Sequence, residues 1–234
     1  MNAKHYEQFA HETLGFDFHD IGLLMTAFTH RSYLNEHKST VREHNERLEF
    51  LGDAVLELAV TEYLYKNYNE PEGVLTNWRS ALVRTESIGA AAVRLDFERM
   101  LRLSRGERKD STRGRAQILA NSFEAVIGAI YLDQGYEEAS DFIARTILVT
   151  LEDILAKGIW MDPKSHLQEI VQSEDGVTPI YKVLSEEGPD HEKIFEVGVY
   201  VEGKLIGKGS GSSKQLGQQQ AAENALRHYA YKIS

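Results

Sequence analysis

The most informative stretch of this sequence covers residues 45–56 and reads NERLEFLGDAVL. Its apolar residues recur at intervals of three and four, which is the period of an amphipathic helix. On such a helix Glu46, Glu49 and Asp53 fall within an arc of roughly 60° on one face. Three like charges on one face repel each other and do not stabilise a helix. Two interpretations remain open: a solvated acidic surface, or a face that binds a divalent cation such as Mg²⁺, which prefers oxygen ligands.

A second apolar stretch repeats this theme at residues 117–133, which read QILANSFEAVIGAIYLD. If it forms a helix, Asn121 and Glu124 share one face because they are three residues apart. A glutamate in such an apolar helix is costly unless it is paired or bound to a metal ion. A neighbouring arginine and a metal ion are both open as its partner.

Composition limits the class of protein. The chain has 234 residues, a formal net charge of −10 and no cysteine. The absence of cysteine excludes a disulfide scaffold and any cysteine-ligated zinc or iron–sulfur site. The N-terminus lacks the apolar stretch of a signal peptide, and no apolar run approaches the ~18 residues of a membrane span. We therefore expect a cytoplasmic protein that has no membrane partner.

The periodicity divides the chain into two parts. It is helical from Ala3 to about Gly158, with breaks at residues 69–73 and 105–115. The remainder predicts an α-β-β-β-α order, with a turn at Glu202-Gly203 and a loop over residues 209–213. Asp162 and Pro163 start its first helix, which extends to about Gln172, and Ser212 or Ser213 caps its last, which extends to about Tyr231. Its predicted strands cover residues 180–184, 194–201 and 204–209.

These stretches resemble known sequence blocks. Residues 45–56 match the signature of the ribonuclease III endonucleases throughout. Residues 28–33 (FTHRSY), 82–87 (LVRTES) and 119–133 resemble further blocks of the same enzymes in the same order. The C-terminal segment resembles a double-stranded-RNA-binding domain. On these motifs the chain is identified as a member of the bacterial-type ribonuclease III family over essentially its whole length.

The resemblance implies a fold and an activity. The fold would be an all-helical endonuclease domain (residues 1–157), a linker (158–163) and a small α-β-β-β-α domain that binds double-stranded RNA (164–234). The activity would be Mg²⁺-dependent cleavage of double-stranded RNA, with Mn²⁺ as a substitute metal and no nucleotide cofactor. The products would carry 5′-phosphate and 3′-hydroxyl ends with short 3′ overhangs, from ribosomal RNA precursors and messenger RNAs. The family acts as a homodimer with two active sites in one cleft.

The resemblance also assigns roles in the endonuclease domain. Phe50 would pack into the partner subunit, although an ordinary core phenylalanine is the alternative. His30 and His44 are interpreted as structural rather than catalytic. Asp53 and Glu124 would be catalytic, the metal ligands would be Glu49, Asp53, Asn121 and Glu124, and the auxiliary residues of the acidic site would be Glu46 and Glu72, with Glu72 on a loop.

Asn121 departs from the family pattern, which has an aspartate at this position. Asparagine keeps a carbonyl oxygen that can bind a metal ion or its water, but it loses one negative charge. Because Glu49, Asp53 and Glu124 are present, we expect activity to survive with a higher Mg²⁺ requirement. The alternative is a catalytically weak or silent protein that binds double-stranded RNA. A helical DNA-binding protein is a third reading, but no basic recognition helix supports it.

The predicted RNA-binding segment has its own candidate residues. Lys214, at the start of the last helix, would meet phosphates, although an ordinary surface lysine is the alternative. Gln215 stands where the family usually has a second lysine, so we expect a weaker salt dependence of binding. The residues predicted to contact RNA are Ser165, Gln168, Glu169, His191 and Lys214.

Overall fold

The computed structural model describes residues 2–108, 113–156, 158, 160, 162–189 and 193–233. The chain divides into two compact units, Met1–Trp160 and Met161–Ser234. This division falls within the predicted linker of residues 158–163. Lys157, the predicted last residue of the first domain, lies outside the described residues. Within those ranges, no helix is both long enough and apolar enough to cross a membrane.

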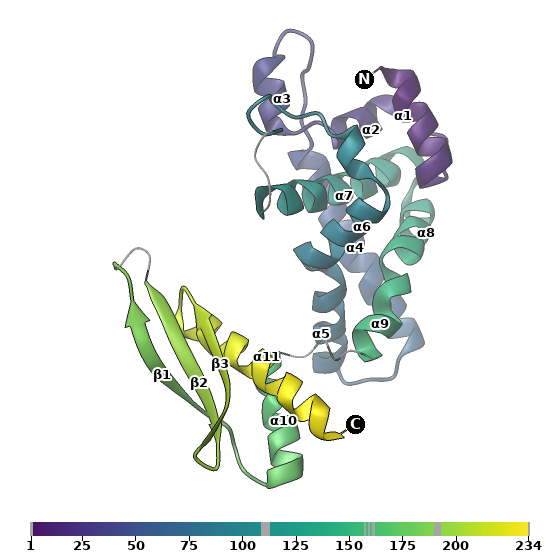
Figure 1. The fold of residues 1–234 in the computed structure, drawn as a ribbon. Helices are drawn as coiled ribbons and strands as arrows, with labels where there is room; N and C mark the ends of the chain where they lie inside the picture. Colours follow the sequence, from purple (N-terminus) through teal and green to yellow (C-terminus); the bar gives the residue numbers. More distant parts are fainter. Residues whose placement is uncertain are drawn as a thin grey trace. The chain divides into compact units, whose positions relative to one another are not determined.

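The first unit is helical, as predicted (Figure 1). Its long helices are α4 and α7, and shorter helices and turns surround them. The α-helices are α1 (Ala3–Phe9), α2 (Ile21–Ala27), α3 (Arg31–Glu36), α4 (Glu46–Asn67), α5 (Glu72–Val83), α6 (Thr85–Arg94), α7 (Arg113–Gln134), α8 (Tyr136–Thr146) and α9 (Leu151–Ala156). Ala10–Leu14 forms a π-helical turn, and Phe97–Met100 and Leu148–Thr150 form 3₁₀ turns.

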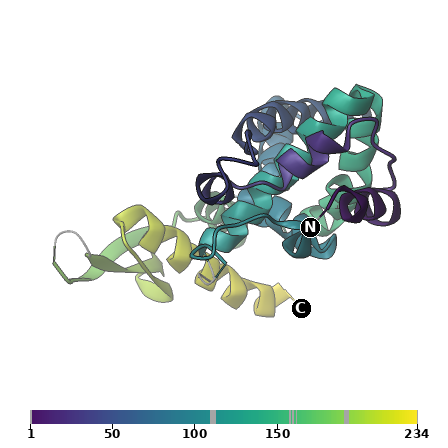
Figure 2. The same cartoon turned by 90° about the horizontal axis from the view of Figure 1, so that it is seen from above.

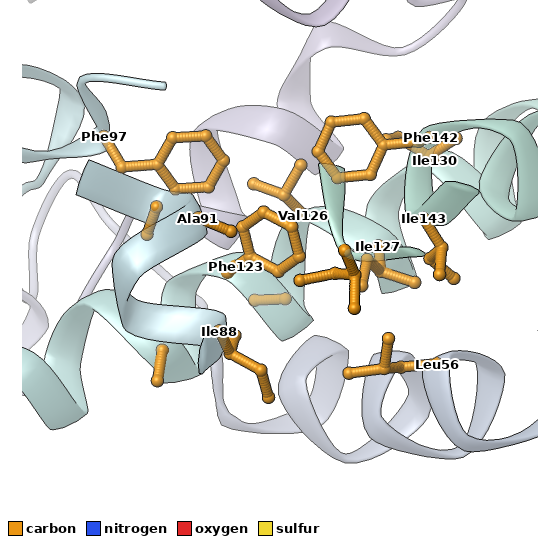
Figure 3. Close-up of a cluster of buried hydrophobic side chains, with 14 of the residues drawn as sticks. Leu56, Ile88, Ala91, Phe97, Phe123, Val126, Ile127, Ile130, Phe142 and Ile143 are labelled. Carbon is orange, nitrogen blue, oxygen red and sulfur yellow. The ribbon is translucent and has the colours of Figure 1, made fainter. Parts of the chain in front are cut away.

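Helix α7 runs through the core of this unit. It packs against α4, α6 and α8, and the residues from Ala125 to Ile127 are completely buried on successive faces of the helix. A helix that is apolar on all sides is stable only when other elements surround it. Figure 3 shows Phe123 and Ile127 of α7 among side chains of the neighbouring helices. The buried residues directly before and after Glu124, Phe123 and Ala125, therefore fix its position on the helix.

The second unit is a three-stranded antiparallel sheet in the order β1-β2-β3, with two helices on one face (Figures 1 and 2). Its inward-facing valines and the small residues of the last helix form a separate apolar core. The elements are α10 (Pro163–Asp175), β1 (Ile180–Glu187), β2 (Ile194–Val201), β3 (Lys204–Gly211) and α11 (Lys214–Ile233). The predicted α-β-β-β-α order is confirmed.

Local sequence signals explain where these elements begin and turn. The Asp162 carboxylate accepts hydrogen bonds from the backbone N–H groups of Lys164 and Ser165, which caps α10 at the predicted position. Glu202 and Gly203 both have positive φ, at 49° and 79°. Two consecutive positive φ angles give a turn whose twist matches that of the strands it connects, so β2 and β3 form a tight hairpin.

Several element boundaries differ from the predictions: β1 extends to Glu187 and α10 to Asp175, each about three residues past its predicted end. Residues 209–211 belong to β3 instead of a loop, because the helix α11 packs directly on the strand there. A Cβ atom on Gly209 would lie 2.2 Å from the backbone nitrogen of Ala221, so glycine serves this contact and not a turn. Helix α5 begins at Glu72 and α7 begins at Arg113, inside the two predicted breaks. Pro71 occupies the N-cap of α5, so Glu72 is its first helical residue and not a loop carboxylate.

Candidate active site

Two glycines bring α4 and α7 into backbone contact. A Cβ atom on Gly52 would lie 1.8 Å from the carbonyl oxygen of Glu124, and one on Gly128 would lie 2.3 Å from that of Leu48. No side chain fits at either position unless the helices move apart. The crossing point thus holds the backbone of Glu124 against the turn of α4 that carries Glu49 and Asp53. Sequence reasoning missed both glycines, although glycine in the middle of an apolar helix is itself a signal of close approach.

The carboxylates at this crossing repel one another. Burial, together with the smaller effects of the Asp53 and Glu49 charges, raises the pKa of Glu124 to about 7. Burial and the charge of Glu46 also raise the pKa of Glu49. The structure therefore brings the predicted acidic residues of α4 close enough to Glu124 for their charges to interact. The interpretation of Glu124 as paired with a neighbouring arginine finds no support, because no arginine contributes to its pKa.

Asn121 acts as a bridge between two neighbouring side chains. Its amide donates a hydrogen bond to Glu49, which partly offsets the rise in the pKa of that carboxyl group. Its carbonyl oxygen accepts a hydrogen bond of 2.6 Å from the amide of Gln117, one turn earlier on α7. The one atom of Asn121 that could bind a cation is therefore engaged by Gln117. Sequence reasoning did not identify Gln117 as part of this site.

Glu46 lies at the outer edge of the acidic group. Its carboxylate is 3.5 Å from Arg31 and 3.9 Å from the Nδ1 atom of His44. His44 also accepts a hydrogen bond from the backbone N–H of Glu46, and His30 caps α3 through the backbone N–H of Ser32. Both histidines thus have structural contacts, in line with their interpretation from the sequence.

Glu72 does not join the acidic group within one chain. It lies beside a groove of about 640 Å³ together with Thr61 and Tyr65 in the second half of α4. Thr61 follows Asp53 by eight residues, which is about 12 Å along a helix. Within one chain the structure therefore does not bring Glu72 to the acidic group, and its role at an acidic site stays a prediction.

The donor atoms fit a divalent cation, but they are not yet arranged around one. The acidic group supplies carboxylate oxygens whose mutual repulsion a cation would relieve, and Mg²⁺ and Mn²⁺ prefer such ligands. Across the described part of the chain, no group of three or more histidine, aspartate or glutamate side chains is placed to hold a metal ion. A metal ion would therefore have to draw Glu49, Asp53 and Glu124 together.

Phe50 lies on α4 beside this acidic face, and its side chain is exposed. It is 82% accessible to solvent, which is the largest exposure among the exposed large apolar residues described. The alternative of an ordinary core phenylalanine is therefore wrong. A cavity of about 750 Å³ lies next to Phe50 and is lined in part by Leu23, Arg47 and Leu132.

The predicted RNA-contact residues of the second unit are mostly exposed. Ser165, Gln168 and Glu169 follow one another along the exposed side of α10. Lys214 is the first residue of α11, and its Nζ atom lies 3.1 Å from the carboxylate of Glu186 on β1. Sequence reasoning missed Glu186. His191 lies outside the described residues.

Comparisons with known proteins agree with this architecture. Residues 20–151 match a family model described as Ribonuclease-III-like, and residues 163–229 match one described as Double-stranded RNA binding motif. Ribonuclease 3 from Streptococcus gordonii is 46% identical over 224 residues, which cover 95% of this chain and 96% of that protein. Ribonuclease 3 from Streptococcus pneumoniae strain P1031 is 47% identical over 211 residues, which cover 90% of each chain.

A solved structure is similar in the first unit. The nuclease domain of ribonuclease III from Campylobacter jejuni has a TM-score of 0.53 and 38% sequence identity, and the match covers 60% of this chain and 94% of that one. That structure is described as flexible in a region involved in dimer formation. The sequence identity of 46–47% to the two Streptococcus proteins extends over at least 90% of this chain. Together with the two family models, which match in order along the chain, it establishes the family. The chain belongs to the ribonuclease III family, and it is an endoribonuclease.

Proposed function

We propose that this chain is a divalent-metal-dependent endoribonuclease that cleaves double-stranded RNA. The observation that carries this proposal is the crossing of α4 and α7, which holds Glu124 next to Glu49 and Asp53, where burial and the two neighbouring charges raise the pKa of Glu124 to about 7. Such a set is unfavourable for folding and becomes favourable only when a cation binds. The matched RNA-binding motif at residues 163–229 supports duplex RNA as the substrate.

Glu49, Asp53 and Glu124 would hold the metal ion, with Asn121 as a fourth, weaker ligand. Mg²⁺, or Mn²⁺ in its place, would stabilise negative charge on the scissile phosphate and lower the pKa of the attacking water. Asp53 and Glu124 are proposed as the catalytic pair. Because the pKa of Glu124 is near neutral in the metal-free chain, this carboxyl group can give up its proton when the site fills.

Glu46 would take part at the outer edge of the site, where it lies next to Arg31. Hydrolysis is proposed to leave 5′-phosphate and 3′-hydroxyl ends with short 3′ overhangs. The proposed substrates are ribosomal RNA precursors and structured messenger RNAs in the cytoplasm, on the resemblance to the family.

The second unit would supply affinity for duplex RNA. Such domains read the shape of an A-form helix through its 2′-hydroxyls and phosphates. Ser165, Gln168 and Glu169 are exposed along α10, as contact with a minor groove requires. Lys214 at the N-terminus of α11 would meet a phosphate, where the helix dipole also favours negative charge. His191 is proposed to enter a second minor groove.

A homodimer is proposed as the active form. An exposed phenylalanine on the helix that carries the acidic residues is costly in water, and burial against a second chain would remove that cost. Glu72, at the start of α5, lies beside Thr61 and Tyr65 in the second half of α4, too far from the carboxylates of its own chain to join them. It would therefore act at the acidic site of a partner subunit.

A second candidate is a silent protein that binds duplex RNA without cutting it. The hydrogen bond from Gln117 to the Asn121 carbonyl oxygen favours this candidate, because it competes with a metal ion for that oxygen. The retained carboxylates at positions 49, 53 and 124 favour the enzyme.

The test is cleavage of a perfect RNA duplex by the purified full-length chain across a Mg²⁺ titration. Glu124→Gln should reduce the cleavage rate at least 10³-fold while it leaves duplex affinity in the absence of metal unchanged. The matched control is Glu137→Gln, which removes the same charge from the exposed surface of α8 and should cleave normally.

The outcomes separate the two candidates. Mg²⁺-dependent cleavage that is lost in Glu124→Gln and kept in Glu137→Gln supports the enzyme. Duplex binding without cleavage at any Mg²⁺ concentration, with cleavage gained in Asn121→Asp, supports the silent candidate. A chain that neither binds nor cuts the duplex contradicts both.

A further inference from the structure

The lysine that would meet an RNA phosphate is already paired with a carboxylate. The Nζ atom of Lys214 lies 3.1 Å from Oε1 of Glu186, across the gap between α11 and β1. It also lies 5.5 Å from the centre of the Phe195 ring on β2. The other carboxylate oxygen of Glu186 is 3.6 Å from the Nζ atom of Lys193. Glu186 thus sits between two lysines of the second unit.

The pairing affects the electrostatics of Glu186. Its pKa is lowered, first by the hydrogen bond from Lys214 and then by the charges of Lys214 and Lys193. The carboxylate is therefore ionised and bound at neutral pH. Both partners remain partly exposed, so an incoming anion can reach Lys214.

A phosphate that binds Lys214 must compete with this carboxylate. The ammonium group has three donors, but a phosphate placed on it would also stand close to the negative charge of Glu186. Either the ion pair breaks, or two anions share one cation. Both alternatives make the free energy of RNA binding less favourable than it would be with a neutral residue at position 186.

We propose that Glu186 lowers the affinity of this chain for duplex RNA by competing with phosphate for Lys214. The proposal rests on the proposed function of Lys214 as a phosphate contact. It assigns an affinity-determining role to a residue on β1 that is not among the residues predicted to contact RNA. It also adds to the effect of Gln215, since one cation of this surface is absent and the next is partly neutralised.

The ion pair has a consequence for the salt dependence of binding. The salt slope reflects the cations that basic side chains displace from the RNA phosphates, and a lysine whose charge is balanced by a carboxylate displaces few of them. If position 186 is neutral, the full charge of Lys214 can displace a cation from the RNA on binding. The slope should then become steeper by less than about one unit.

The alternative is that Glu186 orients Lys214 toward the phosphate and thereby helps binding. The two roles predict opposite signs for the same substitution. Competition predicts tighter binding when Glu186 is neutralised, whereas orientation predicts weaker binding.

The experiment measures the affinity of the full-length chain for a perfect RNA duplex without divalent metal, so that no cleavage occurs. Glu186→Gln should bind about 1.5- to 5-fold tighter at low salt, which corresponds to the strength of an exposed ion pair. The same substitution in a Lys214→Gln background should lose most of this gain. Glu187→Gln, which removes the same charge at the next position of β1, is the matched control.

Each result has a defined meaning. A gain that depends on Lys214, exceeds that of Glu187→Gln and comes with a steeper salt slope supports the proposal. An unchanged or weaker affinity of Glu186→Gln overturns it, and so does an equal gain in the Lys214→Gln background. If the wild-type chain does not bind the duplex at all, or if Lys214→Gln binds as well as wild type, the proposed function of this surface has failed instead.

Discussion

The acidic group at the crossing of α4 and α7 and the carboxylate of Glu186 in the second unit have opposite electrostatic surroundings. At the crossing of α4 and α7 in the first unit, burial and neighbouring negative charges raise the pKa of Glu49 and raise that of Glu124 to about 7. In the second unit, Glu186 is held by lysines, and its pKa is lowered. One unit therefore collects negative charge that a cation can neutralise. The other already pairs its negative charge with the cations that would meet RNA.

The difference shows what each surface is suited to bind. Repulsion among carboxylates that core packing holds in place is relieved by protonation or by a ligand with positive charge. Ion pairs at a surface are weak and can be exchanged for contacts with another anion. Catalysis needs the first arrangement, while reversible attachment to a polyanion can use the second.

The largest effect on cleavage is expected from a substitution that moves the carboxylates of α4 and α7 apart. Gly128→Ala places a methyl group where the carbonyl oxygen of Leu48 is only 2.3 Å away. A displacement of about 1 Å at a catalytic site can cost about 10²-fold in rate, and overpacking of this kind costs about 1–3 kcal/mol of stability. We expect a cleavage rate about 10²-fold lower with unchanged duplex affinity, measured under conditions where circular dichroism shows the chain to be folded.

Gly114→Ala is the matched control for that substitution. Gly114 lies on the same helix, and a Cβ atom there would meet nothing within 4 Å. This variant should cleave normally and be equally or slightly more stable. If both variants cleave normally, the crossing does not set the geometry of the acidic site.

The second test asks whether Phe50 of the first unit anchors a dimer. Phe50→Ala removes an aromatic ring that is 82% exposed in one chain. If the ring anchors a dimer, its loss should cost about 2 kcal/mol, or roughly 30-fold in the dissociation constant. Sedimentation at several protein concentrations measures this change. Val93→Ala, at a residue that is 62% exposed on α6, should leave association unchanged, and equal dimerisation of all three chains would rule out Phe50 as the anchor.

A smaller effect, on the Mg²⁺ requirement, is expected when a negative charge is added to the acidic group of the first unit. Asn121→Asp replaces a donor to Glu49 with a fourth carboxylate. We expect the Mg²⁺ concentration at half-maximal cleavage to fall several-fold, because a more negative site binds the cation more strongly. Asn77→Asp, on the exposed surface of α5, adds the same charge elsewhere. An equal shift in both variants would mean that net charge, and not the acidic site, controls the Mg²⁺ requirement.

Much of the fold follows from local signals in the sequence. Asp162 and Pro163 set the start of α10, and the turn at Glu202-Gly203 sets the β2–β3 hairpin, because caps and turns depend on neighbouring residues. The acidic face of α4 was predictable from spacing alone. The length of β3 was not, because Gly209 looks like a loop residue until α11 is packed against it.

The parts of the site that sequence reasoning missed depend on contacts between distant segments. The position of Glu72 follows from the way α5 packs along α4, which no local pattern records. The hydrogen bond between Gln117 and Asn121 depends on which way an amide group points. The pair of Glu186 and Lys214 joins residues that are far apart in the sequence. Periodicity predicts faces of elements, but it does not predict which faces meet.

The central claim is that the acidic group of α4 and α7 binds a divalent cation and that Glu124 loses a proton when it does so. Calorimetric titration of Mg²⁺ into the metal-free, full-length chain tests this claim directly, in buffers with different ionisation enthalpies. Because the pKa of Glu124 is about 7, the metal-free carboxyl group is about half protonated at pH 7 and ionised at pH 9. We predict release of about half a proton per bound ion at pH 7 and almost none at pH 9, with both binding and release lost in Glu124→Gln. Binding without proton release at pH 7, or equal binding by Glu124→Gln, would contradict the account.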